Sequence, residues 1–272
     1  MFTGKVCVIT GAANGIGREL VQQLLNKGAI IYGIDTDELN LNRVAAESAK
    51  LSRDFYSCVS DVTSETEMAK VRETILSRHP GIDFWFNNAG IAGTGDFLTT
   101  PHATFRRVIS VNLDGVVLGT RIALETMEQK GAGTIINMAS VAGHLAAPFL
   151  SAYSASKHAV VGFTRALREE LSLKDSSVQL IMVSPGFVET QMVNKGKTFG
   201  FPDWLSFLLA TPEQTVKEIL RGIEKGKSEI YPTLNGKALM KLRTFFPKTT
   251  AKSSRVLLAK RFRDLFLNRY SP

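Results

Sequence analysis

The chain has 272 residues, of which 44% are hydrophobic and 21% charged, a balance that allows a large buried core and argues against disorder. No apolar run approaches the roughly 18 residues of a membrane span, and the first residues lack the basic region and the small-residue cleavage site of an export signal. Two cysteines, Cys7 and Cys58, fall in predicted strands, which indicates reduced thiols in a cytoplasmic protein. No set of metal ligands has a usable spacing, so no metal site is expected.

The positive charge is concentrated at the end of the sequence. The chain has 33 basic and 25 acidic residues. Residues 233–272 contain ten of the basic and one of the acidic residues, so 23 basic and 24 acidic residues precede them. We therefore expect one domain over residues 1–232 and a basic extension over 233–272.

The predicted elements alternate between strands and helices from the first strand onward. In chain order they cover residues 5–10 (strand), 18–27 (helix), 29–34 (strand), 36–51 (helix), 55–59 (strand), 64–78 (helix), 82–86 (strand), 103–130 (helix), 134–140 (strand), 151–173 (helix), 178–184 (strand) and 229–231 (strand). This alternation predicts an α/β fold of Rossmann type, a doubly wound and mostly parallel sheet of seven strands. Such sheets bind ligands at the carboxyl ends of their strands.

A glycine-rich turn joins the first strand to the first helix. Gly11, Gly15 and Gly17 have the spacing GxxxGxG, with Asn14 and Ile16 between them. Glycine lets the backbone turn sharply and approach a pyrophosphate, which the N–H groups at a helix start can bind. The spacing differs from the commoner GxGxxG, and the same residues would also suit a plain tight turn.

Asp35 ends the second predicted strand, about twenty residues beyond the glycine turn. A carboxylate there can accept hydrogen bonds from ribose hydroxyls and would repel a 2′-phosphate, whereas the alternative is a solvent-facing loop residue. Neither Asn14 nor Thr36 supplies a cation for such a phosphate. The pattern therefore favours NAD over NADP.

Three later turns carry polar or small residues at strand ends. Asp61 is placed to meet an adenine amino group, or equally to cap the helix that starts near Ser64. The run 87–90, Asn-Asn-Ala-Gly, allows a ligand to approach closely or forms a polar turn. Asn112 interrupts the apolar face of the helix over 103–130 at 111–113, where it would kink the helix or hold a water.

Tyr153 and Lys157 are four positions apart in the helix predicted over 151–173, and Ser140 ends a predicted strand thirteen positions before Tyr153. On a helix this spacing places the two side chains on one face. A nearby ammonium favours a phenolate and lowers the phenol pKa from about 10, as proton transfer near neutral pH requires. Ser140 could hold a substrate oxygen beside the phenol. The alternative is an ordinary surface Tyr and Lys.

In these motifs the sequence closely resembles the short-chain dehydrogenase/reductase family, over roughly residues 4–231. The resemblance rests on the glycine turn, the run 87–90, Asn112, Ser140, the pair Tyr153 and Lys157, and Pro185-Gly186, in the family's order and spacing. It implies that Tyr153 transfers the substrate proton, that Lys157 lowers its pKa and holds the nicotinamide ribose, that Ser140 orients the substrate oxygen, and that Asn112 holds a water. It also implies a set of cofactor-binding residues: Gly11, Asn14, Gly15, Ile16 and Gly17 at the pyrophosphate, Asp35 at the ribose, Asp61 and Val62 at the adenine, Asn88, Ala89 and Gly90 beside the cofactor, and Pro185, Gly186, Val188 and Thr190 near the nicotinamide, together with Tyr153 and Lys157.

The expected activity is hydride transfer between NAD and a secondary alcohol or ketone. An NADP-linked reductase is a rival, and so is a nucleotide-sensing protein that kept the fold without the chemistry. The family also suggests a homodimer or homotetramer built on the helices over 103–130 and 151–173.

The substrate lid is expected at residues 187–211, where the chain is rich in apolar and aromatic side chains. The pocket residues proposed there and near Ser140 are Phe149, Leu150, Phe199, Phe201, Trp204, Phe207 and Leu208. They favour a lipophilic substrate, although they could also pack on the core or across a subunit interface.

Residues 254–270 form a basic amphipathic pattern, with Leu258, Phe262 and Leu265 on its apolar face. Such a helix can lie on an anionic membrane surface, which would make the protein membrane-peripheral, or dock on a subunit. Nucleic-acid binding is disfavoured, because large apolar residues alternate with the basic ones.

Overall fold

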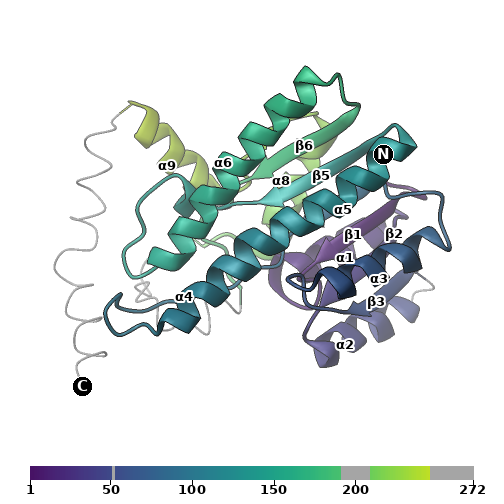
Figure 1. The fold of residues 1–272 in the computed structure, drawn as a ribbon, viewed down its shortest axis with the longest axis horizontal. Helices are drawn as coiled ribbons and strands as arrows, with labels where there is room; N and C mark the ends of the chain where they lie inside the picture. Colours follow the sequence, from purple (N-terminus) through teal and green to yellow (C-terminus); the bar gives the residue numbers. More distant parts are fainter. Residues whose placement is uncertain (51–52, 191–208, 246–272) are drawn as a thin grey trace.

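The computed structural model describes residues 1–50, 53–190 and 209–245. These residues form one seven-stranded sheet in the order β3-β2-β1-β4-β5-β6-β7, and every neighbouring pair is parallel (Figure 1). The strands are β1 (Val6–Thr10), β2 (Ile30–Asp35), β3 (Phe55–Val59), β4 (Phe84–Asn87), β5 (Gly133–Met138), β6 (Val178–Val183) and β7 (Glu229–Ile230). The chain reverses its direction of travel across the sheet between β1 and β4, and there the carboxyl edge opens a crevice for ligands.

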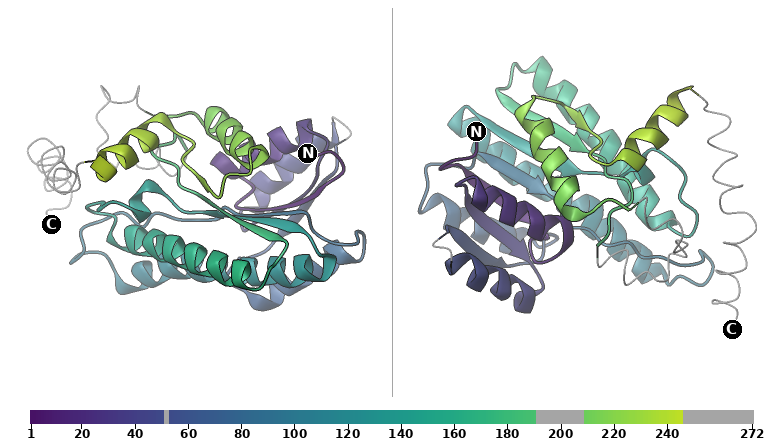
Figure 2. Two further views of the ribbon diagram at one scale, coloured as in Figure 1. Left: turned by 90° about the horizontal axis from the view of Figure 1, so that it is seen from above. Right: turned by 180° about the vertical axis from the view of Figure 1, so that it is seen from behind.

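Helices cover both faces of the sheet, as the view from above shows (Figure 2). They are α1 (Gly15–Asn26), α2 (Glu38–Ala49), α3 (Glu65–Leu76), α4 (His102–Ile109), α5 (Gly115–Lys130), α6 (Ser151–Leu173), α8 (Pro212–Glu224) and α9 (Leu234–Phe245), with a π-helix, η1 (Ser110–Asp114), and a 3-10 turn, η2 (Val141–Gly143). Apolar side chains of α1, α2 and α8 pack on one face, and those of α3, α5 and α6 pack on the other.

The strands are apolar on both faces because helices cover both. All five residues of β1 are buried. Cys7 and Ile9 join the core beneath α1 and α8, whereas Val6 and Val8 join the core beneath α3 and α5. The expected Rossmann-type sheet is therefore confirmed.

Two helices differ from the sequence prediction. The helix expected over 103–130 is divided into α4, η1 and α5, with the interruption at the predicted place. The helix α8 was not among the predicted elements, although Thr211 caps it by accepting the Gln214 N–H and Pro212 occupies its first turn.

The extension predicted over 233–272 begins with α9, and the rest of it, including the amphipathic pattern over 254–270, lies outside the described residues. No helix in the described ranges has the length and apolarity that crossing a bilayer requires.

Candidate active site

The glycine turn between β1 and α1 lies at the crevice. Gly11 and Gly15 have positive φ angles of 68° and 54°, a backbone region that favours glycine. A Cβ on Gly11 would lie 2.9 Å from the Ala89 Cα, and one on Gly17 would collide with the Gly11 carbonyl. Glycine is therefore required at these positions, because a side chain there would be strained or would collide with neighbouring atoms.

The amino end of α1 has no side-chain cap. Asn14 occupies the capping position, but its amide donates to the Asp37 carboxylate at 3.1 Å instead of accepting a helix N–H. The first turn also contains no acidic residue. Unpaired N–H groups at a helix start suit a phosphate. The turn thus fits the pyrophosphate of a dinucleotide, with Ile16 packed against the core below it.

Two carboxylates stand where the ribose is expected. Asp35 accepts the Ala13 N–H at 2.9 Å and the Asp37 N–H at 3.0 Å, so it braces the glycine turn. Asp37, which the sequence analysis did not single out, caps α2 by accepting the Asn40 N–H. Arg18, the basic residue directly after the glycine turn, is held by both carboxylate oxygens of Glu47 at 2.8 Å.

Asp61 lies just after β3 and is not the cap of α3, since Ser64 takes that role. One oxygen of Asp61 accepts from Thr63, and the other forms a 2.8 Å ion pair with Arg107 of α4. Burial opposes ionisation, but the hydrogen bonds from Thr63 and Arg107 outweigh it and lower the pKa of Asp61. Val62 is buried beside it. The role of both at an adenine stays a prediction.

The loop after β4 is tied to the glycine turn. The side-chain amide of Asn88 donates to the Thr10 carbonyl at 2.9 Å, and the backbone N–H of Asn88 donates to the Thr10 hydroxyl. Ala89 also donates to that hydroxyl at 3.0 Å. A Cβ on Gly90 would lie 3.2 Å from Asn112 Oδ1 and 3.7 Å from Lys157 Nζ. Small residues in this loop therefore bring two strand ends and two helices together.

Asn112 lies inside η1 and is fully buried. Its Oδ1 accepts the Ile91 N–H at 2.8 Å, and its amide donates to the Ile91 carbonyl at 2.9 Å and to Ser156 at 3.0 Å. The amide protons are fully used, so a bound water would have to donate to an oxygen of Asn112. The expected irregularity is thus a π-helix that holds the loop after β4.

Ser140 caps η2 by accepting the Ala142 N–H, two residues beyond the end of β5. The first turns of α6 dock on this short helix. Ser154 donates to the Ala142 carbonyl at 2.9 Å, and a Cβ on Gly143 would lie 2.6 Å from the Lys157 carbonyl. This close packing fixes Ser140 relative to the two side chains of α6.

Tyr153 and Lys157 lie on the face of α6 that meets this turn. Lys157 Nζ is 5.7 Å from the Tyr153 ring centroid and donates to the Met138 carbonyl at 2.7 Å. Burial lowers the pKa of Lys157 from 10.5 to about 8. Burial also raises the pKa of Tyr153, while its hydrogen bond with Ser140 acts in the opposite direction. This direction for the pKa of the phenol is opposite to that expected from a neighbouring ammonium, because burial dominates.

The segment after β6 returns to the same edge. Val188 is buried and forms a parallel bridge with Ala210, and the Glu189 N–H donates to the Ala210 carbonyl at 2.9 Å. Thr190 lies beside the glycine turn, since a Cβ on Gly15 would be 3.2 Å from its methyl group. The two ends of the predicted lid, residues 187–211, are therefore joined to each other by backbone pairing.

Of the predicted substrate residues, Phe149 and Leu150 are described. Both are partly buried in the loop before α6, where Phe149 has a φ of 60°, and its carbonyl accepts the Gly95 N–H at 3.0 Å. The other predicted members, Phe199, Phe201, Trp204, Phe207 and Leu208, lie outside the described residues.

A doubly wound sheet with a glycine turn at its crevice and Ser, Tyr and Lys beside it defines the class of dinucleotide-binding oxidoreductases. The family model for short chain dehydrogenases matches residues 5–198. The chain belongs to the short-chain dehydrogenase/reductase family.

Relatives and solved structures of similar length match most of the chain. A protein named SadH from Mycobacterium tuberculosis is 32% identical over 246 residues, which cover 88% of this chain and 89% of the relative. A short-chain dehydrogenase/reductase from Burkholderia phymatum, solved with NAD, is 26% identical with a TM-score of 0.81 and covers 91% of this chain and 95% of its own. A variant of actinorhodin polyketide ketoreductase, solved with NADPH, is 26% identical with a TM-score of 0.76 and covers 85% and 97%.

Proposed function

We propose that this protein transfers a hydride between NAD(H) and a secondary alcohol or ketone, with Tyr153 as the general acid and base. The main support is that the packing of α6 on η2 keeps Ser140, Tyr153 and Lys157 close together, beside the loop after β4 to which Asn112 is hydrogen-bonded. The dinucleotide, when bound, supplies or accepts the hydride. A turnover assay with secondary alcohols and ketones tests the proposal, and cofactor binding without any turnover would favour a nucleotide sensor.

The protonation state of the Tyr153 phenol decides whether it can donate a proton to the substrate. Because burial raises its pKa, Tyr153 is protonated at neutral pH and can donate to the oxygen of a ketone as that oxygen gains negative charge. Ser140 would hold the oxygen beside the phenol by a second hydrogen bond. Lys157, whose Nζ lies 5.7 Å from the centroid of that ring, would stabilise the phenolate left behind and bind the nicotinamide ribose. The site therefore suits ketone reduction near neutral pH.

The related structures with NAD and with NADPH support a nicotinamide dinucleotide as the cofactor. The carboxylates of Asp35 and Asp37 and the pairing of Arg18 with Glu47 support NAD, since a 2′-phosphate would meet negative charge and find Arg18 occupied. NAD should therefore bind more tightly than NADP.

Asp37→Asn tests this electrostatic reading. Asparagine also caps helices well, so α2 is retained while one charge is lost. We expect the Kd for NADP to fall about fivefold, the effect of about 1 kcal/mol of screened repulsion, and the Kd for NAD to stay within about twofold. Asp175→Asn, in the turn before β6 at the opposite edge, is the matched control and should change neither value. Unchanged NADP affinity in Asp37→Asn would remove this residue from the specificity determinants.

We further propose a lipophilic substrate. Besides Phe149, the described loops at the carboxyl edge expose apolar side chains, including Phe97 (67%), Leu98 (90%) and Phe187 (43%). In a series of straight-chain secondary alcohols, kcat/KM should rise with chain length as more apolar surface is buried, by up to about fourfold per methylene. Turnover confined to small polar alcohols would reject this class of substrate.

Assembly and location remain proposals as well. We propose a homodimer or homotetramer through α5 and α6 in the cytoplasm, and a role for the basic extension over 233–272 in contacting a membrane surface or a subunit. The net charge of that extension supports either contact. Vesicle co-sedimentation of the full chain and of a chain ending at Phe245 distinguishes a membrane contact from a subunit contact. Light scattering gives the oligomeric state.

A further inference from the structure

The first turn of α9 is joined to the backbone that follows β6. The Asn235 amide donates to the Phe187 carbonyl at 3.1 Å, and Asn235 Oδ1 accepts the Phe187 N–H at 3.3 Å. The side chain thus pairs with both polar backbone groups of Phe187, as a neighbouring strand would. Residues 48 apart in sequence are held together in this way.

Thr233 completes the junction and is 2% exposed. Its hydroxyl accepts the Gly186 N–H at 3.0 Å and the Gly236 N–H at 3.1 Å, and donates to Asn235 Oδ1 at 2.7 Å. A Cβ on Gly186 would collide with Asn235 Oδ1. Because the hydroxyl makes three hydrogen bonds and no space remains, the position of Gly186 depends on the start of α9.

The same junction touches the turn that carries Ser140. The Val141 N–H donates to the Pro185 carbonyl at 2.9 Å, and a Cβ on Gly236 would lie 3.3 Å from a Val141 methyl group. On its other side the backbone continues directly to Val188 and Thr190, and Thr190 lies beside Gly15. The start of α9 therefore supports the loops after both β5 and β6.

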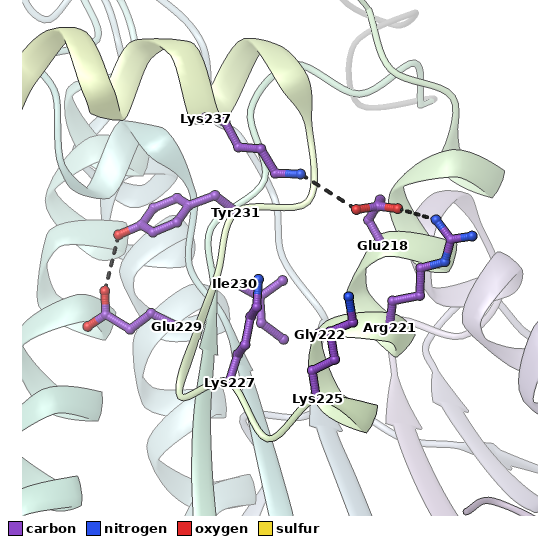
Figure 3. Close-up of a pocket in the computed structure, with 9 residues that line it drawn as sticks. All are labelled: Glu218, Arg221, Gly222, Lys225, Lys227, Glu229, Ile230, Tyr231 and Lys237. Atoms are coloured by element: carbon purple, nitrogen blue, oxygen red, sulfur yellow. Dashed lines mark hydrogen bonds and ion pairs between the residues drawn. The ribbon is translucent and has the colours of Figure 1, made fainter.

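A second tether holds α9 without touching these loops. Lys237 Nζ lies 3.5 Å from a carboxylate oxygen of Glu218 on α8, across a cavity of about 550 Å³ that is lined also by Arg221, Tyr231 and Glu229 (Figure 3). Both side chains of this ion pair are partly exposed, so water screens their attraction and the pair is weak. It offers a control on the same helix.

We propose that Asn235, together with Thr233, is a positioning residue for the nicotinamide end of the cofactor. It holds the backbone of Gly186 and Phe187, and through that backbone sets the place of Val188 and Thr190. This inference rests on the proposed function, because it assumes a nicotinamide dinucleotide in the crevice. The beginning of the basic extension is then part of the active site's support.

The test compares NAD with ADP-ribose, which lacks the nicotinamide ring. In Asn235→Ala the Kd for NAD should rise about tenfold, while the Kd for ADP-ribose stays within about twofold of the wild-type value. Asn235→Asp keeps the acceptor for the Phe187 N–H but loses the donor, so NAD should weaken by a smaller factor. Lys237→Ala should leave both affinities unchanged. Isothermal calorimetry measures all four proteins, with thermal unfolding as the check on folding.

Equal weakening of NAD and ADP-ribose, or no weakening of either, would overturn the positioning role. If Asn235→Ala does not fold, Asn235→Asp decides by the same comparison. A wild-type chain that binds ADP-ribose and NAD equally well also overturns it, since the nicotinamide end would then contribute nothing. A wild-type chain that binds neither molecule contradicts the proposed function itself.

Discussion

Replacing Tyr153 with Phe is expected to lower turnover by about 10²–10⁴-fold, the usual contribution of a positioned general acid. The substitution removes one hydroxyl and leaves the ring, whose centroid lies 5.7 Å from Lys157 Nζ. NAD affinity should change by less than about twofold, because the residues proposed to hold the adenosine half, the glycine turn and the Asp35 that braces it, do not include the phenol. Steady-state kinetics with NADH and a ketone, and calorimetry with NAD, measure the two effects separately.

Tyr56→Phe is the matched control. Tyr56 lies on β3, and its ring stacks on Tyr32 with centroids 4.8 Å apart. Removal of its hydroxyl keeps that stacking and should leave kcat unchanged. Wild-type turnover in Tyr153→Phe would assign the proton to another group. Loss of NAD binding in the same variant would show that the phenol supports the cofactor rather than the chemistry.

The sheet and most helices followed from the sequence because their patterns are local. Apolar runs buried on both faces identify parallel strands, and the position of Asn112 in an apolar face marked the break that the structure shows as η1. The sequence analysis missed α8 despite a clear signal, since Thr211, Pro212 and Glu213 are typical of a helix start.

The contacts that complete the site were beyond prediction because they join distant residues. Arg107 meets Asp61 across 46 residues, and Asn235 meets Phe187 across 48, with no spacing rule to connect either pair. A local pattern also cannot give the pKa of Tyr153. The spacing of Tyr153 and Lys157 predicted a lowered value, but burial and the hydrogen bond from Lys157 to Met138 depend on the folded packing.

Lys157→Met should abolish most turnover and change how stability depends on pH. Burial lowers the pKa of Lys157 from 10.5 to about 8, so the folded protein loses this proton at lower pH than the unfolded chain. Below pH 8 both states are charged and the folded state bears the full burial cost, about 3 kcal/mol from that difference. Between pH 8 and 10.5 the unfolded state binds more protons, so this cost is progressively relieved as pH rises.

Methionine fills similar space without the charge and leaves the Met138 carbonyl without its donor, which costs about 1 kcal/mol. The variant should therefore be about 2 kcal/mol more stable than the wild type at pH 7, with the difference shrinking as the pH rises above 8 and reversing before pH 10.5. Denaturant unfolding across this range measures it, and Lys70→Met, at an exposed position on α3, should give a curve parallel to the wild type. A pH-independent difference for Lys157→Met would mean that the ammonium is not penalised by burial. A stability gain together with lost turnover would show that the fold keeps a buried charge at this position because the chemistry requires it.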